Sequence, residues 1–129
     1  MPRTDVIFYQ EDRNDVPVLD WLKVLRRTDR RAYESCVAAI ARLAELGHEL
    51  RRPLANILRD NIYELLRIRK GRVNYRILYF FHGRNLAILG HGLTKEDTVP
   101  RVDIERAIRR KKAFEADPAE HSYLEEEGK

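Results

Sequence analysis

The sequence has only one cysteine, Cys36, among its 129 residues. A single cysteine excludes an internal disulfide and any metal site built from several cysteines. No pair of histidines or carboxylates has the spacing of metal ligands either, so we expect no metal and no cofactor. Apolar runs are short: a stretch such as Ile77–Phe81 is far below the roughly 20 residues of a membrane-spanning helix. Charged residues also interrupt the first part of the chain, where a secretion signal is apolar. We therefore expect a cytoplasmic protein that does not contact a membrane.

Hydrophobic residues make up 43% of the chain and charged residues 36%, a balance typical of a folded globular protein. The length is that of a single domain. We expect one domain over residues 1–116, followed by an acidic, flexible tail over residues 117–129.

Acidic residues are scarce between residues 51 and 95, where two acids stand against ten lysines and arginines. The whole chain carries a formal charge of +4, so this segment is more basic than the rest. Concentrated positive charge favours a polyanionic partner, because binding releases the counterions of that partner. The alternative is that these are ordinary surface arginines of a charge-rich protein.

The pattern of apolar residues predicts an α+β fold with the order β-α-α-β-β-β-α and a central antiparallel sheet. A strand is expected over residues 5–10. Two helices follow, one opening at Pro17 and one capped by Asp29, and they form a hairpin that packs on one face of the sheet. Gly47 ends the second helix. Its apolar stripe includes Cys36, which we interpret as a core residue and not as a nucleophile.

The second half of the chain changes to the period of strands. Strands are expected over residues 62–69, 72–81 and 86–91, joined by two-residue turns at Lys70-Gly71 and Gly83-Arg84. Pro100 then opens a last helix.

These two turns predict a register, and the register assigns each side chain to a face of the sheet. With a turn at Lys70-Gly71, one face carries Arg67, Arg69, Arg72, Asn74 and Arg76. The opposite face is apolar apart from Glu64 and is the expected seat of the helical hairpin, with Ile62, Ile68, Val73, Tyr75 and Ile77. With a turn at Gly83-Arg84, His91 lies directly opposite Arg76.

Arginines placed opposite one another destabilise a sheet, which indicates that a polyanion binds to this face. RNA, DNA or an acidic protein would each fit the charge. The alternative is that the arginines point into water or pair with Glu64, Asp60 or the acidic tail.

One reaction that such a face can perform is RNA cleavage, in which the ribose 2′-OH attacks the adjacent phosphate. Arg76, in the middle of a strand, is suited to stabilise the charge of the phosphorane. His91 is suited to transfer protons, although a structural histidine fits the pattern equally well. Neither residue belongs to the predicted core.

Four stretches of the sequence resemble a known family: Pro53–Asp60, Ile62–Leu65, Gly71–Phe81 and His91–Lys95. They look like the phage-derived, HigB-like branch of the RelE/ParE toxin superfamily. The segment Asp103–Arg109 fits the closing helix of that family. The resemblance covers about residues 5 to 115.

The resemblance implies a RelE-like fold and the role of toxin in a type II toxin–antitoxin pair. The implied activity is ribosome-dependent cleavage of mRNA, and the implied partner is a helix-turn-helix antitoxin, with operator DNA bound only through the antitoxin complex. Arg76 matches the arginine of the family's Tyr-Arg strand, and Lys95 matches the basic residue after the last strand. The implied catalytic residues are Arg76, His91, Arg67 and Lys95, and the implied RNA-binding residues are Arg69, Lys70, Arg72 and Asn74.

The sequence departs from the family pattern at two places. Leu65-Leu66 is one residue longer than the usual motif, and a bulge there would move Arg67 and Arg69 to the other face. Glu96-Asp97 stands where many relatives carry basic residues. Two alternatives therefore stay open: a ParE-like inhibitor of DNA gyrase, and a degenerate toxin that only binds its antitoxin and operator DNA.

Overall fold

A computed structural model describes residues 3–51, 54–69, 73–95 and 98–124 of the chain. It has α+β architecture, as the sequence predicts. The elements, in chain order, are β1 (Asp5–Phe8), α1 (Pro17–Thr28), α2 (Arg30–Leu46), a 3₁₀ turn η1 (Gly47–Glu49), β2 (Ala55–Ile57), β3 (Tyr63–Arg69), β4 (Val73–Phe81), β5 (Leu86–Lys95), α3 (Arg101–Ala116) and α4 (Pro118–His121).

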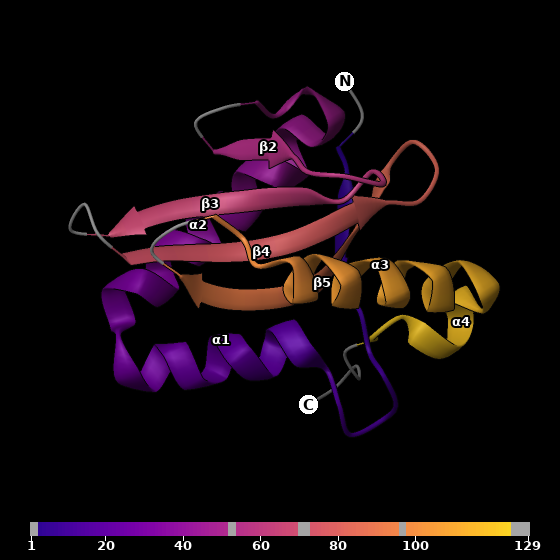
Figure 1. Cartoon of the computed structure of the whole chain (residues 1–129), viewed down its shortest axis with the longest axis horizontal. Coiled ribbons are helices and arrows are strands. Elements are labelled where there is room, and N and C mark those ends of the chain that lie inside the picture. Colours follow the sequence, from indigo (N-terminus) through magenta and orange to yellow (C-terminus); the bar gives the residue numbers. More distant parts are fainter. Residues whose placement is uncertain (1–2, 52–53, 70–72, 96–97, 125–129) are drawn as a thin grey trace.

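The strands form one five-stranded sheet in the order β1-β5-β4-β3-β2 (Figure 1). The neighbours from β2 to β5 are antiparallel, as expected. The first strand differs from the expectation, because β1 pairs parallel to β5. The short edge strand β2 was not predicted, since its three residues carry too little pattern to be recognised.

The helical hairpin forms where the sequence predicts it. Pro17 stands at the start of α1. Asp29 caps α2 by accepting a hydrogen bond from the backbone nitrogen of Ala32 at 3.1 Å, and Gly47 ends α2 with a φ of +51° that favours glycine. Cys36 is buried in the core between this hairpin and the sheet, as predicted. The sheet residues of this core include Leu65, Ile77, Tyr79 and Leu89.

The register between β3 and β4 differs by one residue from the predicted one. Arg69 pairs with Val73, and Leu66 pairs with Arg76. The connection between the two strands therefore has three residues instead of the predicted two. A shift of one residue moves a strand's side chains to the opposite face. Arg76 therefore pairs with Leu66 instead of the predicted Leu65, and Arg67 pairs with Tyr75 instead of the predicted Asn74. The single arginine face expected from the sequence is therefore divided between the two faces.

The register between β4 and β5 contains two shifts. The first is at the hairpin, where Phe81 and not Phe80 pairs with Ala87. The second is a bulge between Leu78 and Tyr79, after which Leu78 pairs with His91. Because the two shifts together amount to an even number of residues, His91 stays on the face of Arg76, as predicted. It does not lie directly opposite, since Arg76 pairs with Leu93.

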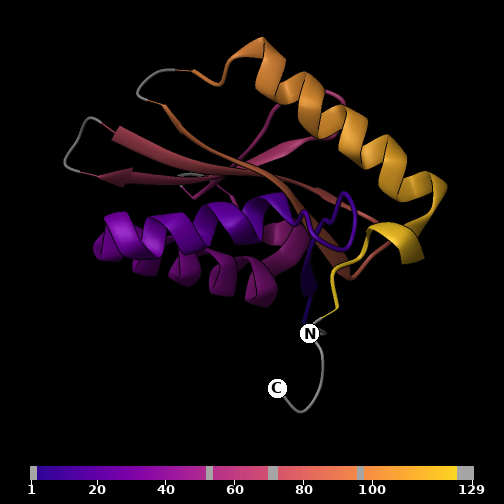
Figure 2. The same ribbon diagram turned by 90° about the horizontal axis from the view of Figure 1, so that it is seen from below.

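Both faces of the sheet are covered (Figure 2): α1 and α2 pack on one face and α3 lies across the other. The helix α3 buries Ala107 and Phe114 in a second core. This core includes the strand residues Leu78, Phe80 and Ile88 and also Ile62, directly before β3, which was expected under the helical hairpin. The face predicted to be an open arginine surface is thus largely a helix-packing surface.

Residues 117–129 were expected to form a flexible tail, but the first part of this segment is docked on the rest of the domain. Its short helix α4 leads to His121, whose ring stacks on Tyr9 with 5.2 Å between the ring centroids. The backbone nitrogen of Tyr123 donates to the carbonyl of Phe8 at 3.0 Å. Aromatic contacts and backbone hydrogen bonds therefore hold residues 120–123 against residues 8–10. Within the described ranges, no helix combines the length and apolar character needed to cross a membrane.

Candidate nucleic-acid interface

One end of the sheet carries Arg69 and Asn74, the two predicted RNA-binding residues that the structure describes, together with Lys95. It is the end where β3 finishes, β4 begins and β5 finishes. Asn74 and Lys95 are register partners across β4 and β5, and Arg69 lies one pair further out on β3. Lys70, Arg72, Glu96 and Asp97 lie outside the described residues. The topology therefore brings two basic positions, Arg69 of β3 and Lys95 of β5, and the neutral Asn74 of β4 to one end of the sheet.

Arg76 lies further inside the sheet and does not form an open phosphate site. Its side chain is 9% exposed and donates to Glu64 Oε1 at 3.2 Å. Glu64 is equally buried, and its other oxygen accepts a hydrogen bond from Asn56 Nδ2 at 3.2 Å. The expectation that Arg76 lies outside the core is thus wrong, because the shifted register places it on the same face as Glu64. A buried carboxylate beside it satisfies the guanidinium electrostatically.

A hollow of about 570 Å³ opens beside this ion pair. Glu64, Arg76 and Asn56 supply its charged and polar lining, together with Thr98. Leu58, Val99 and Ile104 supply its apolar lining. The hollow lies between the sheet and the segment that leads into α3, and Thr98 is three residues beyond Lys95. The hollow is therefore close in sequence to the basic end of the sheet.

His91 is held between two charged side chains of α3. Its Nε2 lies 2.6 Å from Asp103 Oδ1, and Arg110 approaches its Nδ1 at 3.2 Å. Since a guanidinium only donates, Nδ1 accepts and Nε2 carries the proton that goes to Asp103. Arg110 also donates to the carbonyl of Gly90 at 2.7 Å. His91 consequently ties β5 to α3.

The surroundings of His91 favour its neutral form. Burial lowers the pKa of His91 below 6.5, and Arg110 and Arg106 contribute in the same direction. The hydrogen bond and the charge of Asp103 act in the opposite direction without cancelling the effect of burial. The residue itself is only 8% exposed. Of the two roles open for His91, this geometry supports the structural one.

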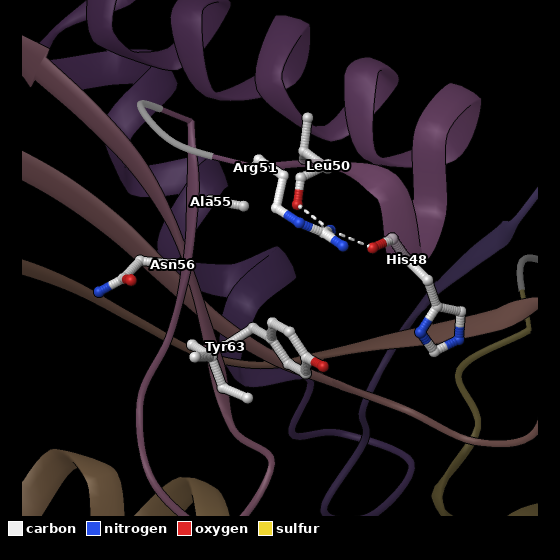
Figure 3. A pocket seen from close by; sticks show the side chains of 7 residues that line it. His48, Leu50, Arg51, Ala55, Asn56 and Tyr63 are labelled. Carbon is white, nitrogen blue, oxygen red and sulfur yellow. Dashed lines mark hydrogen bonds between the residues drawn. The ribbon is translucent and has the colours of Figure 1, made fainter.

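A second cavity was not found from the sequence. It has a volume of about 680 Å³ and lies between η1, β2 and β3 (Figure 3). Arg51 crosses its upper part and donates to the backbone carbonyls of His48 and Leu50. Tyr63 forms another part of its lining. The amide group of Asn56 points away from these side chains, consistent with its hydrogen bond to Glu64 (Figure 3).

The sequence did contain a signal for the Arg76–Glu64 pair. With the predicted register, Glu64 is the only charged residue on an otherwise apolar face. A buried carboxylate without a partner is costly, so this exception argues against that register. Moving the register by one residue places Glu64 on the face of Arg76 and resolves the conflict.

The comparisons with known proteins place the chain in a family. Residues 21–112 match the family model described as phage-derived protein Gp49-like (DUF891). No curated protein matches the chain. The matched segment includes most of α1, all of α2, the strands β2 to β5 and most of α3. With most of its length covered by this match, the chain belongs to the phage-derived Gp49-like family, a toxin-like family.

Proposed function

We propose that this protein is the toxin of a type II toxin–antitoxin pair, that its fold is RelE-like, and that it cleaves mRNA on the ribosome. Membership of a toxin-like family supports the toxin role. The element order supports the fold assignment, since it follows the expected β-α-α-β-β-β-α order apart from the short strand β2 and the last helix.

The observation that carries the nuclease proposal is that two basic positions, Arg69 and Lys95, lie at the end of the sheet where β3 and β5 finish. Asn74 and Lys95 are paired there, and Arg69 occupies the end of the neighbouring strand. Cations along one edge suit a polyanionic strand, because phosphate contacts dominate the affinity for nucleic acids. In the proposed reaction the ribose 2′-oxygen attacks the adjacent phosphorus and the 5′-oxygen leaves, giving a 2′,3′-cyclic phosphate and a 5′-hydroxyl.

The structure changes the roles proposed for the individual residues. Lys95 remains the candidate for stabilising the negative charge of the phosphorane, whereas Arg67 pairs with Tyr75 and therefore belongs to the opposite face of the sheet. Arg76 and His91 act in this proposal as positioning residues, because their polar groups are engaged by Glu64 and by Asp103 and Arg110. The proposed neutralising partner is a helix-turn-helix antitoxin.

The same engagement of Arg76 and His91 favours one alternative function. If these groups are only structural, two of the four expected catalytic residues are removed. A toxin that inhibits DNA gyrase by binding needs neither of them. We therefore keep gyrase inhibition as the second candidate.

Inducible expression without the antitoxin tests both candidates. The nuclease proposal expects growth arrest with newly cleaved mRNA, and cleavage by the purified protein on translating ribosomes. Lys95→Ala should reduce cleavage by about 10²-fold or more, as for the loss of one preorganised donor. Arg84→Ala is the matched control, because Arg84 is exposed in the β4–β5 loop at the other end of these strands, and it should cleave normally.

The other outcomes contradict the proposal. Arrest with intact mRNA and inhibited supercoiling by gyrase would support the second candidate. Normal growth at a confirmed level of folded protein would support the degenerate toxin that only binds its antitoxin.

A further inference from the structure

We propose that the hollow beside the Arg76–Glu64 pair binds a guanine base. This inference deepens the proposed function and rests on it in one respect, namely that the base belongs to the RNA held at the adjacent end of the sheet.

The size and lining of the hollow fit a small planar molecule. Its volume of about 570 Å³ falls in the ordinary range of roughly 300–1,000 Å³ for small-molecule sites. Leu58, Val99 and Ile104 offer apolar surface to the faces of a ring. The polar groups of Asn56 and Glu64 are available to its edge. An apolar lining with few convergent polar groups is typical of sites that recognise bases.

The charge of the hollow disfavours a phosphate. Glu64 and Arg76 are in contact at 3.2 Å, so their charges offset each other. The remaining lining residues, among them Asn56 and Thr98, are neutral. A phosphate that entered would lie close to the carboxylate of Glu64 and would be repelled by it. A neutral ligand with N–H donors avoids this repulsion.

The carboxylate of Glu64 selects among the bases. Each of its oxygens accepts one hydrogen bond in the structure, from Arg76 and from Asn56, and each carboxylate oxygen can accept two. The remaining capacity is a pair of adjacent acceptors. Guanine presents two adjacent donors on its Watson–Crick edge, N1–H and the 2-amino group. Adenine, cytosine and uracil each present an acceptor beside their donor on that edge, which the carboxylate would repel.

The neighbouring amide completes the match. Asn56 Nδ2 uses one hydrogen for Glu64 Oε2, and an amide nitrogen carries two. The second hydrogen can be donated to O6 of guanine, which adjoins N1–H. The hydrogen bond to Glu64 also fixes the orientation of the carboxylate before the ligand arrives, which reduces the entropy cost of binding.

A nucleoside titration tests the proposal independently of cleavage. Guanosine, which carries no phosphate, is titrated into the full-length protein while the backbone amide resonances of Asn56, Thr98 and Val99 are followed by NMR. We expect saturable shifts with guanosine and none with adenosine at the same concentrations. Inosine lacks the 2-amino group and should bind about 10–100-fold more weakly than guanosine, the effect of losing one hydrogen bond to a charged acceptor.

Two variants and one control locate the site. Glu64→Gln replaces one acceptor by a donor and should weaken guanosine binding by at least about 10-fold. Val99→Phe fills the hollow from its partly exposed wall and should abolish guanosine binding. This variant tests the site independently if the Glu64→Gln protein does not fold. Val37→Phe makes the same kind of change on the exposed surface of α2, on the other face of the sheet, and should bind normally.

Several results would overturn the proposal. These are the absence of saturable shifts with guanosine, equal affinity for guanosine and adenosine, or unchanged binding by folded Val99→Phe protein. Failure of this site and failure of the proposed function are distinguishable. Cleavage of mRNA without guanosine binding removes only the base site, whereas guanosine binding by a protein that cleaves no mRNA removes only the nuclease function.

Discussion

Replacing Arg76 with alanine should lower the melting temperature of the protein by about 10 °C at neutral pH. The substitution removes the guanidinium that contacts Glu64 at 3.2 Å and leaves the carboxylate in a position where its side chain is 9% exposed. Breaking a buried ion pair from one side costs about 3–5 kcal/mol, because the remaining charge stays buried without its counter-charge.

The lower end of this range applies here. The hollow beside Glu64 gives water access to the carboxylate once the arginine is shortened, and hydration offsets part of the lost interaction. We therefore expect a loss of about 3 kcal/mol in the free energy of unfolding. For a chain of this length, each kcal/mol corresponds to roughly 3–5 °C in melting temperature, which gives the expected decrease of about 10 °C.

Thermal and urea unfolding of three proteins measure the effect. They are the wild type, Arg76→Ala, and a double variant in which Arg76→Met is combined with Glu64→Leu. Replacing both charges by apolar side chains of similar volume should restore the stability to within about 1 kcal/mol of the wild type, because no charge is left buried alone. The m value of urea unfolding should stay constant in all three, as expected when the change is local.

Two outcomes would refute this reasoning. An Arg76→Ala protein that melts within about 3 °C of the wild type would mean that Glu64 is hydrated or satisfied without Arg76. A double variant less stable than the single variant would mean that the packing around the pair, and not its charge, sets the cost.

Three further predictions concern the contacts that hold the sheet to its covering elements. Because the pKa of His91 is lowered in the folded protein, the unfolded chain binds a proton more readily than the folded one. The free energy of unfolding should therefore fall as the pH drops below about 6.5. His91→Gln should flatten the dependence of melting temperature on pH between about 5 and 7. A Cβ atom at Gly92 would lie 2.5 Å from the indole ring of Trp21 in α1, so Gly92→Ala should cost about 1–3 kcal/mol in the free energy of unfolding and alter tryptophan fluorescence. A Cβ atom at Gly90 has its nearest contact at 3.4 Å, so Gly90→Ala should change the stability and the fluorescence much less. His121→Ala removes the ring that stacks on the buried Tyr9, directly after β1, and should destabilise the protein by about 1 kcal/mol. Leu124→Ala, at a residue that is 77% exposed, should leave the melting temperature unchanged.

Local patterns predicted the elements but not their lateral pairing. The helical hairpin and the core position of Cys36 follow from caps and helical periodicity, which depend on neighbouring residues alone. The parallel pairing of β1 with β5 involves segments about 80 residues apart, and no local signal in β1 specifies a parallel partner. The docking of His121 and Tyr123 on Phe8, Tyr9 and Gln10 is likewise a contact between distant parts of the chain.

The candidate site was predicted in composition and only in part in geometry. The sequence predicts a concentration of positive charge, and the structure brings Asn74 and Lys95 together at one end of the sheet. The structure does not make an open catalytic centre of Arg76 and His91, because Arg76 contacts Glu64 and His91 contacts Asp103 of α3. Glu64 and Asp103 were not predicted as their partners. Charge content is a property of composition, whereas an ion pair requires two positions to meet in space.

The sequence by itself determined the α+β class, the helical hairpin, the extent of β3 and β4 and the basic character of residues 51–95, whereas β5 continues to Lys95, beyond its predicted end at residue 91. Each of these depends on residue type and on spacing over a few positions. Only the tertiary structure decided which face each strand residue occupies, because one additional residue between β3 and β4 exchanges the two faces. It also decided that α3 covers the face of Arg76. The physical reason is that alternation along a strand is local, whereas register depends on the length of the connection and on all the packing that the paired strands make.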